Sequence, residues 1–343
     1  MAKSLLIITQ RVDSGDQLLG FFVSWIRLFA RRFDAVTVIC QSAGTYEFPP
    51  NVSVVSLGKA DGAGKLSQLI RFYCLLWTLR DRYDAVFVHM NPVWAVVGSP
   101  MLRIMGKRIF LWYTHKAVTL RLRIAELFVH GIFTASKESF RLPSDKVVVT
   151  GHGIDTDVFA PDERIAKMTG SLLTVGRIAP VKNLELLVDA ARILLDDDMP
   201  ISVSIVGAAV LSKDRAYERE LRNRIAHSGY ADRFSFAGAY QHEHLVPVYR
   251  SHEVFVHLSR TGSLDKTVLE AMACGMKVVS CNDAARAFLP PEFTFNSNDA
   301  SGSAHAIQHA LSRPAPSALR EYVVAHHNLE RLIDRLSERL FRT

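Results

Sequence analysis

Short β-rich runs alternate with helical stretches along the chain, and this rhythm restricts the fold more than any other feature of the sequence. Such alternation is typical of parallel sheets that helices cover on both faces. The rhythm occurs twice, so the sequence predicts an α/β fold with two doubly wound, Rossmann-like domains. The strands are expected at 5–9, 35–40, 52–57, 85–89, 108–113, 171–175, 202–206, 233–237, 254–257 and 277–280. The helices are expected at 18–33, 66–80, 183–195, 216–228, 267–274 and 303–312.

The length of 343 residues is enough for two domains with separate cores. Turn-forming residues between Gly151 and Pro161 lie between the two alternating patterns. We therefore predict an N-terminal domain over 1–160 and a C-terminal domain over 161–318. Apolar residues recur at helical spacing over 319–343, which indicates one or two amphipathic helices that pack back on the N-terminal domain.

Composition excludes several classes of protein. An apolar fraction of 49%, with 13 prolines and 19 glycines, describes a folded chain rather than a disordered one. The four cysteines have no CxxC spacing, which argues against a zinc site or a disulfide scaffold. No secretory signal is recognised, and the uncharged stretch 85–102 contains Pro92 and Pro100. We expect that stretch to be a buried strand and a separate helix, and the protein to be cytoplasmic.

The net charge of +7 belongs to the first half. Residues 1–160 carry 19 Lys and Arg against 12 Asp and Glu, whereas 161–343 carry 22 of each sign. A basic half suits an anionic partner, but no nucleic-acid module accompanies it, so no nucleic-acid partner is predicted. Arg27, Arg31 and Arg32 end an apolar helical stretch. That stretch is either core, or it places the domain peripherally on an anionic membrane face.

Two blocks in the second half carry residues suited to chemistry. In the first, Gly176, Arg177 and Lys182 follow an apolar strand, and Asn183 is placed to cap the next helix. Two cations beside a helix N-terminus suit a diphosphate, although a solvated loop would have the same composition. In the second block, Glu270 either closes a capping box with Thr267 or accepts hydrogen bonds from ribose hydroxyls.

These blocks resemble a known signature. Gly153-Ile154-Asp155-x-x-Val158-Phe159-x-Pro161, then Gly176-Arg177-x4-Lys182, then Val268-Leu269-Glu270-Ala271-Met272-Ala273-Cys274-Gly275 are similar to the motifs of family 4 (group 1) retaining glycosyltransferases. The resemblance implies the GT-B architecture, two facing Rossmann-like domains with a cleft between them. It covers residues 150–343 well and the first half in outline.

The resemblance also implies roles for single residues. Arg177 and Lys182 correspond to the pair that grips the donor diphosphate, and Glu270 to the ribose-binding glutamate. His115, at the end of a predicted strand, corresponds to the histidine near the donor sugar. The remaining positions implied to contact the donor are Gly15, Gly176, Asp265, Lys266, Thr267 and Val268.

One position departs from the family pattern. The family has a glutamate eight residues before the ribose-binding one, and Gly262 stands there in this chain. Either Asp265 takes over contact with the donor sugar, or Asp265 only favours the positive end of the following helix. The sequences Asp155-Thr156-Asp157 and Asp196-Asp197-Asp198 are interpreted as hinge and turn residues rather than metal ligands.

The sequence therefore predicts a retaining glycosyltransferase that needs neither metal nor cofactor. It would move a sugar from a nucleotide-diphosphate donor to a glycan or lipid-linked acceptor of cell-envelope polysaccharide synthesis. Two alternatives remain open at this stage. The loss of the acid at Gly262 is compatible with a nucleotide-sugar-binding pseudoenzyme, and a nucleotide-sugar epimerase would share the architecture.

Overall fold

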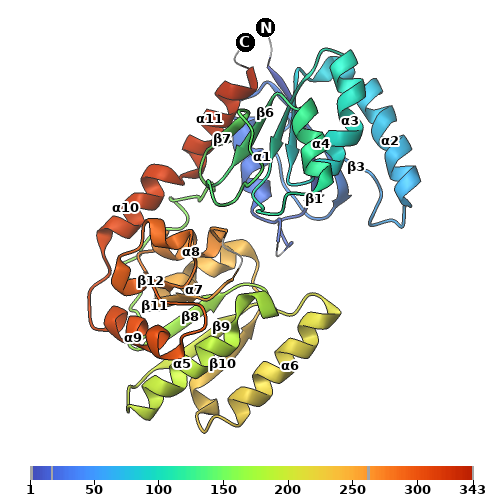
Figure 1. Ribbon diagram of the computed structural model, residues 1–343. Coiled ribbons are helices and arrows are strands. Elements are labelled where there is room, and N and C mark those ends of the chain that lie inside the picture. Colours follow the sequence, from blue (N-terminus) through green and yellow to red (C-terminus); the bar gives the residue numbers. More distant parts are fainter. Residues whose placement is uncertain (1–2, 17, 261–262, 342–343) are drawn as a thin grey trace. The chain divides into compact units, whose positions relative to one another are not determined.

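The computed structural model describes residues 3–16, 18–260 and 263–341, and the chain divides into two compact α/β units (Figure 1). The first unit comprises Met1–Gly153 and Leu329–Thr343, and the second comprises Ile154–Asn328. From the sequence, the boundary between the two domains was predicted at 160/161, and the C-terminal segment that packs back on the first domain was predicted to begin at 319. Contacts place these points at 153/154 and at 329.

The first unit is built on a parallel sheet with strand order β3-β2-β1-β4-β5-β6-β7. Side chains alternate between its two faces, as the period of two in a strand requires. On β1, for example, Leu5 and Ile7 enter one core, whereas Leu6 and Ile8 enter the other. The strands are β1 (Ser4–Val12), β2 (Ala35–Ala43), β3 (Val52–Ser56), β4 (Ala85–His89), β5 (Arg108–Trp112), β6 (Gly131–Thr134) and β7 (Val147–Val149).

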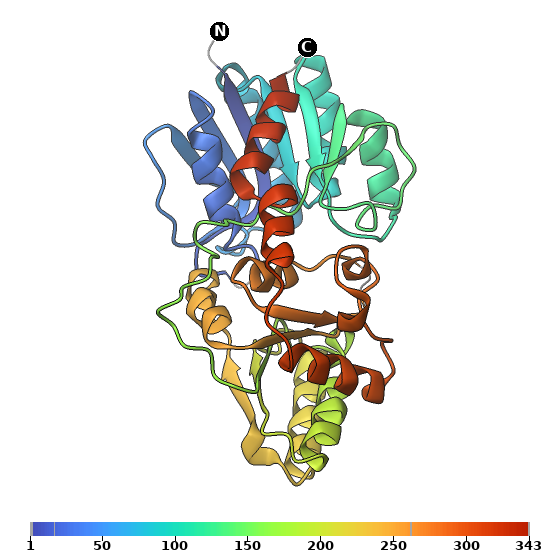
Figure 2. The same ribbon diagram turned by 90° about the vertical axis from the view of Figure 1, so that its left-hand side faces the viewer.

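Helices cover both faces of this sheet. On one face lie α1 (Phe22–Ala30) and α11 (Leu329–Phe341), and Figure 2 shows α11 against the sheet. On the other face lie α2 (Lys65–Thr78), α3 (Pro92–Ile104) and α4 (Leu120–Phe128). The uncharged stretch 85–102 is therefore a buried strand followed by a separate helix, as predicted. No helix in the described ranges is long and apolar enough to cross a membrane.

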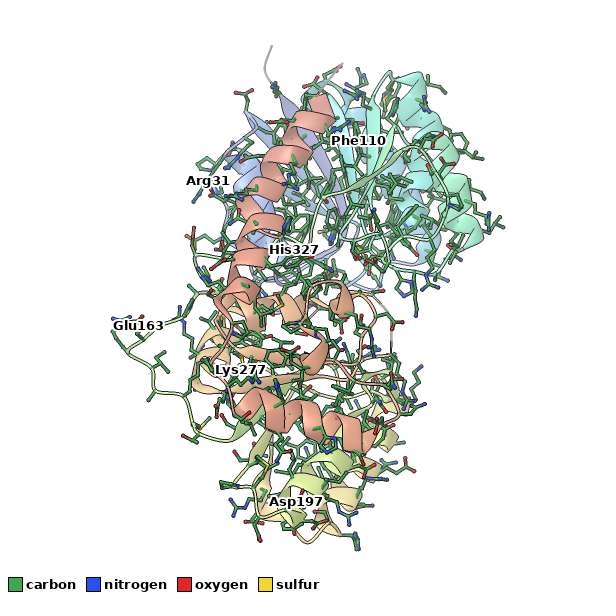
Figure 3. All side chains as sticks on the ribbon, turned by 60° about the vertical axis from the view of Figure 1, so that its left-hand side comes forward. Arg31, Phe110, Glu163, Asp197, Lys277 and His327 are labelled. Atoms are coloured by element: carbon green, nitrogen blue, oxygen red, sulfur yellow. The ribbon has the colours of Figure 1, made fainter. Side chains whose placement is uncertain are left out.

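The apolar stripe of α1 is core, so α1 presents no apolar face to a membrane. Phe22, Trp25 and Phe29 are buried, because α11 and the sheet enclose them. The neighbouring cations are also engaged: Arg31 Nη1 lies 3.5 Å from Glu330 and Arg32 Nε lies 2.8 Å from Asp334. Figure 3 shows Arg31 beside α11. Of the two interpretations of this stretch, the core is confirmed.

The second unit has a parallel sheet with strand order β10-β9-β8-β11-β12. Its strands are β8 (Ser171–Val175), β9 (Ser202–Val206), β10 (Phe234–Gly238), β11 (Val254–His257) and β12 (Lys277–Ser280). One core cluster lies under α5 (Leu184–Asp196), α6 (Ser212–Ala226) and α9 (Ala300–Leu311). The opposite cluster lies under α7 (Leu245–Ser251), α8 (Lys266–Ala273) and α10 (Ser317–His326).

The C-terminal stretch forms two helices that belong to different units. Leu319 and Val323 of α10 pack in the core of the second unit, beside α8. The chain then passes Asn328, which pairs with Ile154 in an isolated bridge, and α11 packs in the first unit. Only α11, rather than the whole of 319–343, joins the N-terminal sheet.

Candidate functional site

A pocket opens at the carboxyl edge of the second sheet, between β8 and β11. These neighbouring strands lie where the strand order changes direction, which is where doubly wound sheets bind ligands. The pocket holds about 280 Å³, open solvent at its mouth included. Gly176, Arg177 and Lys182 line it together with His257 and Ser259, so the structure brings together the glycine and both cations of the first sequence block.

Two glycines let the loops after β8 and β9 approach closely. Gly176 has φ +149° and Gly207 has φ +145°, a backbone region that favours glycine. A Cβ atom on Gly207 would lie 1.8 Å from the carbonyl oxygen of Gly176. The Ile178 N–H also donates to the Ala208 carbonyl at 3.1 Å. This approach fixes the backbone on either side of Arg177, whose Nε lies 3.6 Å from Oδ2 of the buried Asp214.

Lys182 ends a one-turn 3-10 helix, Pro180–Lys182, and the residue after it turns the chain. Asn183 has φ +53° and makes no side-chain cap, so its predicted capping role is wrong. Its amide instead donates to the Ser297 carbonyl at 2.9 Å, and its oxygen accepts from Arg260 at 2.5 Å. Asn183 is buried and joins three loops at this edge of the sheet.

Lys182 is one end of a chain of polar contacts across the pocket. Its ammonium nitrogen lies 2.5 Å from Asp265 Oδ2, which also accepts from His257 Nε2 at 2.9 Å. His257 Nδ1 lies 3.0 Å from the Ser280 hydroxyl, so the chain reaches β12. Burial raises the pKa of the Asp265 carboxyl, but the Lys182 charge and the His257 hydrogen bond outweigh it and hold that pKa below its ordinary value.

The residues that follow Asp265 begin α8. Helix α8 starts at Lys266, so Thr267 lies inside its first turn and cannot be the cap; the predicted capping box is wrong. The Thr267 hydroxyl is buried and has no hydrogen-bond partner among the described residues. Burial lowers the pKa of Lys266 to about 8, although Glu270 opposes the shift. The Val268 side chain packs in the core, and its N–H donates to the Asp265 carbonyl.

Glu270 is buried and has protein partners on both carboxylate oxygens. Oε1 accepts from His242 Nε2 at 2.8 Å, and Oε2 accepts from the Tyr249 hydroxyl at 3.0 Å. Burial raises the pKa of Glu270, but His242, Lys266 and Tyr249 together lower it overall. Glu270 is not among the residues that line the pocket. Ribose binding by Glu270 stays a prediction.

Two predicted site residues belong to the first unit. His115 is exposed after β5, and its Nδ1 accepts from the Ala117 N–H at 3.0 Å. The Gly15 N–H donates to Asp13 Oδ1 at 3.0 Å, so this amide is already used within its loop. The structure does not test either residue's contact with a donor. Gly262 lies outside the described residues.

Sequence reasoning missed His257, Gly207 and Asp214. The sequence did contain a signal for His257, because it ends a predicted strand that borders the switch point, where ligands bind. Asp214 carried no signal, because only the fold brings α6 to Arg177. No metal-binding cluster of His, Cys, Asp or Glu occurs in the part of the chain that the structure describes. Asp155 Oδ1 instead accepts the N–H groups of Asp157 and Val158, as expected for a turn.

The second unit matches a known protein family. Residues 169–313 match the family model of glycosyl transferases group 1. The chain is 28% identical over 226 residues to a D-inositol 3-phosphate glycosyltransferase of Geodermatophilus obscurus, covering 60% of this chain and 48% of that protein. It is 35% identical over 143 residues to the lipopolysaccharide core biosynthesis mannosyltransferase LpsB of Rhizobium meliloti, covering 39% and 40%. The chain thus spans about half the length of these relatives.

Solved structures share the fold at low sequence identity. Anabaena Alr3699/HepE in complex with UDP superposes with a TM-score of 0.78 at 16% identity, over 98% of this chain and 99% of that one. Sucrose-phosphate synthase of Thermosynechococcus elongatus superposes with a TM-score of 0.77 at 18% identity, over 98% of each chain. The predicted GT-B type of fold, with two Rossmann-like α/β units, is confirmed.

Proposed function

We propose that this chain is a glycosyltransferase that uses a nucleotide-diphosphate sugar as donor. The observation that carries the proposal is the convergence of Arg177 and Lys182 on one pocket at the β8/β11 switch point. The match of residues 169–313 to glycosyl transferases group 1 supports it, as do relatives that carry glycosyltransferase names. Alr3699/HepE has been crystallised with UDP and with UDP-glucose, which supports a nucleotide-sugar donor.

The proposed reaction moves the anomeric carbon from a diphosphate oxygen to an acceptor hydroxyl. The bond from that carbon to the leaving oxygen breaks, and the electron pair stays on the diphosphate. Arg177 and Lys182 stabilise this developing charge from fixed positions, which is the principal task of the site. The departing phosphate accepts the acceptor's proton on the same face of the sugar, so the configuration at the anomeric carbon is retained.

The charge of the two side chains makes a metal ion unnecessary in this proposal. In the free protein the Lys182 ammonium forms an ion pair with Asp265, and a bound diphosphate would accept a further hydrogen bond from the same ammonium. Asp265 Oδ1 is the atom left for a hydroxyl of the donor sugar, because Lys182 and His257 both use Oδ2. The acceptor is proposed to be a glycan or a lipid-linked sugar of the cell envelope.

The test is incubation with radiolabelled UDP- and GDP-sugars and a lipid extract, followed by separation of products. Transfer of label to an acceptor is the expected result. Epimerised donor would favour an epimerase, and donor binding without turnover would favour a pseudoenzyme. Arg177→Ala and Lys182→Ala should lower both transfer and nucleotide-diphosphate binding. Arg219→Ala is the matched control, because Arg219 is an exposed cation on α6 of the same unit.

A further inference from the structure

Helix α2 has a second apolar face that the fold leaves uncovered. Its inner face packs in the core through Phe72 and Leu76. Leu66, Ile70 and Trp77 are 71%, 57% and 56% exposed, and Tyr73 between them is 36% exposed. Steps of four, three and four residues place these side chains on one side of a helix. We call this group the α2 face.

Neighbouring helices extend the α2 face rather than cover it. α2 lies beside α3, and α3 beside α4, on one side of the first sheet (Figure 1). The Tyr73 hydroxyl donates to the Val97 carbonyl of α3 at 2.7 Å, which fixes the ring between the two helices. At the end of α3, Ile104 is 88% exposed. Exposed apolar side chains therefore occur on two neighbouring helices.

The charges on the helices around the α2 face are mostly positive, although Asp61 and Asp81 flank α2 and Asp81 lies 3.5 Å from Arg80. Within α2, α3 and α4, all of which the structure describes, Glu126 is the sole acidic residue. Glu126 is engaged by the Ser144 hydroxyl at 2.8 Å and by Lys146 at 3.7 Å. The same three helices present five exposed cations, Lys65, Arg71, Arg103, Arg121 and Arg123. These three helices thus carry a net charge of +4, a large part of the excess of +7 in the first half of the chain.

Trp77 has the surroundings of an interfacial tryptophan. The guanidinium of Arg80 lies 4.6 Å from the Trp77 ring centre, so an aromatic ring and a cation are paired at the end of the helix. Aromatic rings with cations beside an apolar stripe suit the boundary between lipid headgroups and acyl chains. A second copy of this surface fits poorly, because it would place cations against cations.

We propose that the α2 face docks on a lipid bilayer that contains anionic headgroups. Leu66, Ile70 and Trp77 enter the headgroup–acyl boundary, and the exposed cations of α2, α3 and α4 contact the anionic headgroups. This docking surface belongs to the first unit, whereas the pocket belongs to the second, and the proposal does not depend on the proposed transfer reaction. It differs from α1, whose apolar stripe is core.

Tryptophan fluorescence offers a direct readout, because the chain has four tryptophans and the other three are buried. Phosphatidylcholine vesicles with phosphatidylglycerol should shift the emission of the full chain to shorter wavelength. Trp77→Phe should remove this shift without changing the circular dichroism. Vesicles of phosphatidylcholine alone should give little shift, and added salt should weaken the effect with anionic vesicles.

Vesicle flotation tests the same surface without relying on a tryptophan. Ile70→Ser and the double variant Lys65→Glu/Arg71→Glu should each lower the vesicle partition constant about tenfold, a loss of about 1.4 kcal/mol in binding free energy. Met168→Ser is the matched control, because Met168 is a 49% exposed apolar residue of the second unit, and it should bind like the parent. The charge variants keep the test valid if Ile70→Ser folds poorly.

Three results would overturn the proposal. The first is no binding to anionic vesicles at low salt. The second is equal binding by the parent and by both α2 variants, which would place the docking surface elsewhere. The third is a concentration-dependent dimer that Ile70→Ser abolishes while vesicle binding is absent, which would assign the α2 face to a second copy.

Discussion

The Lys182–Asp265 pair allows a quantitative prediction about the second unit. Exposed ion pairs contribute about 0.2–1 kcal/mol, whereas removing one partner of a fully buried pair costs about 3–5 kcal/mol. The side chains of Lys182 and Asp265 are 22% and 21% exposed, so this pair lies between the two limits. We expect a coupling free energy of about 1–2 kcal/mol in a double-mutant cycle with Lys182→Met and Asp265→Asn.

The two substitutions keep the shapes of the side chains. Met keeps an unbranched side chain of similar length at position 182, and Asn keeps a hydrogen-bond acceptor for His257. Urea unfolding of the four proteins at pH 7 measures the coupling. The second unit has the size for which 1 kcal/mol shifts the Tm by about 2–4 °C, so thermal unfolding should resolve it too. Additivity within about 0.3 kcal/mol would refute the assignment of a stabilising pair.

The pH dependence of this coupling has a definite sign. The folded-state pKa of Asp265 is held below the ordinary value, so the carboxylate contributes stability at every pH above that ordinary value. The contribution is lost as pH falls from there through the lowered folded pKa. Coupling should therefore be present at neutral pH and weaken when the pH is lowered below about 4, the ordinary aspartate value; coupling that does not weaken on this acidification would contradict the ionised pair.

Three further predictions concern the pocket and its surroundings. Arg177→Ala and Lys182→Ala should each lower the kcat of sugar transfer about 10²-fold or more, because each removes a positive charge that stabilises the leaving group. Arg219→Ala should match the parent. Full activity of the Arg177→Ala/Lys182→Ala double variant would contradict the assignment. Transfer should persist in EDTA, because two cationic side chains meet the diphosphate, and loss of activity with rescue by Mn²⁺ or Mg²⁺ would contradict this. Lys266, whose pKa is about 8, should react with amine-specific reagents at lower pH than the exposed Lys213. Mass spectrometry of the modified peptides measures the extent of reaction of each lysine against pH. Identical pH dependence of the two lysines would refute the lowered pKa.

The strands that are buried on both faces were predictable from the sequence. Ser171–Val175, Val254–His257 and Lys277–Ser280 are short, largely apolar runs that are buried throughout, and they form strands at the predicted positions. The strand Val147–Val149 and the helix Leu245–Ser251 were not predicted. Three residues carry too little periodicity to identify a strand, and Pro247 lies inside the helix, where proline usually indicates a break.

The site was predictable where one segment supplies it and not where the fold assembles it. Gly176, Arg177 and Lys182 are near neighbours in sequence and share one pocket. The partners of Glu270 were not predictable, because His242 and Tyr249 come from another segment and Glu270 is buried among them. Capping was predicted wrongly for Asn183 and Thr267. The Asn183 side chain bonds to other loops instead of capping its helix. Thr267 lies inside the helix rather than before it, and its hydroxyl has no partner among the described residues.

The two amphipathic helices of the first unit explain why the surface could not be assigned from sequence. Both α1 and α2 carry an apolar stripe with nearby arginines, so both patterns are compatible with core and with a membrane face. The apolar stripe of α1 is covered by α11, which lies about three hundred residues later in the chain. Glu330 and Asp334 of α11 pair with Arg31 and Arg32 beside α1. No equivalent helix covers the outer side of α2 among the described residues, and its apolar side chains remain exposed. The excess of charge therefore identifies the domain for which we propose an anionic partner, whereas tertiary contacts decide which of its helices has an exposed apolar face.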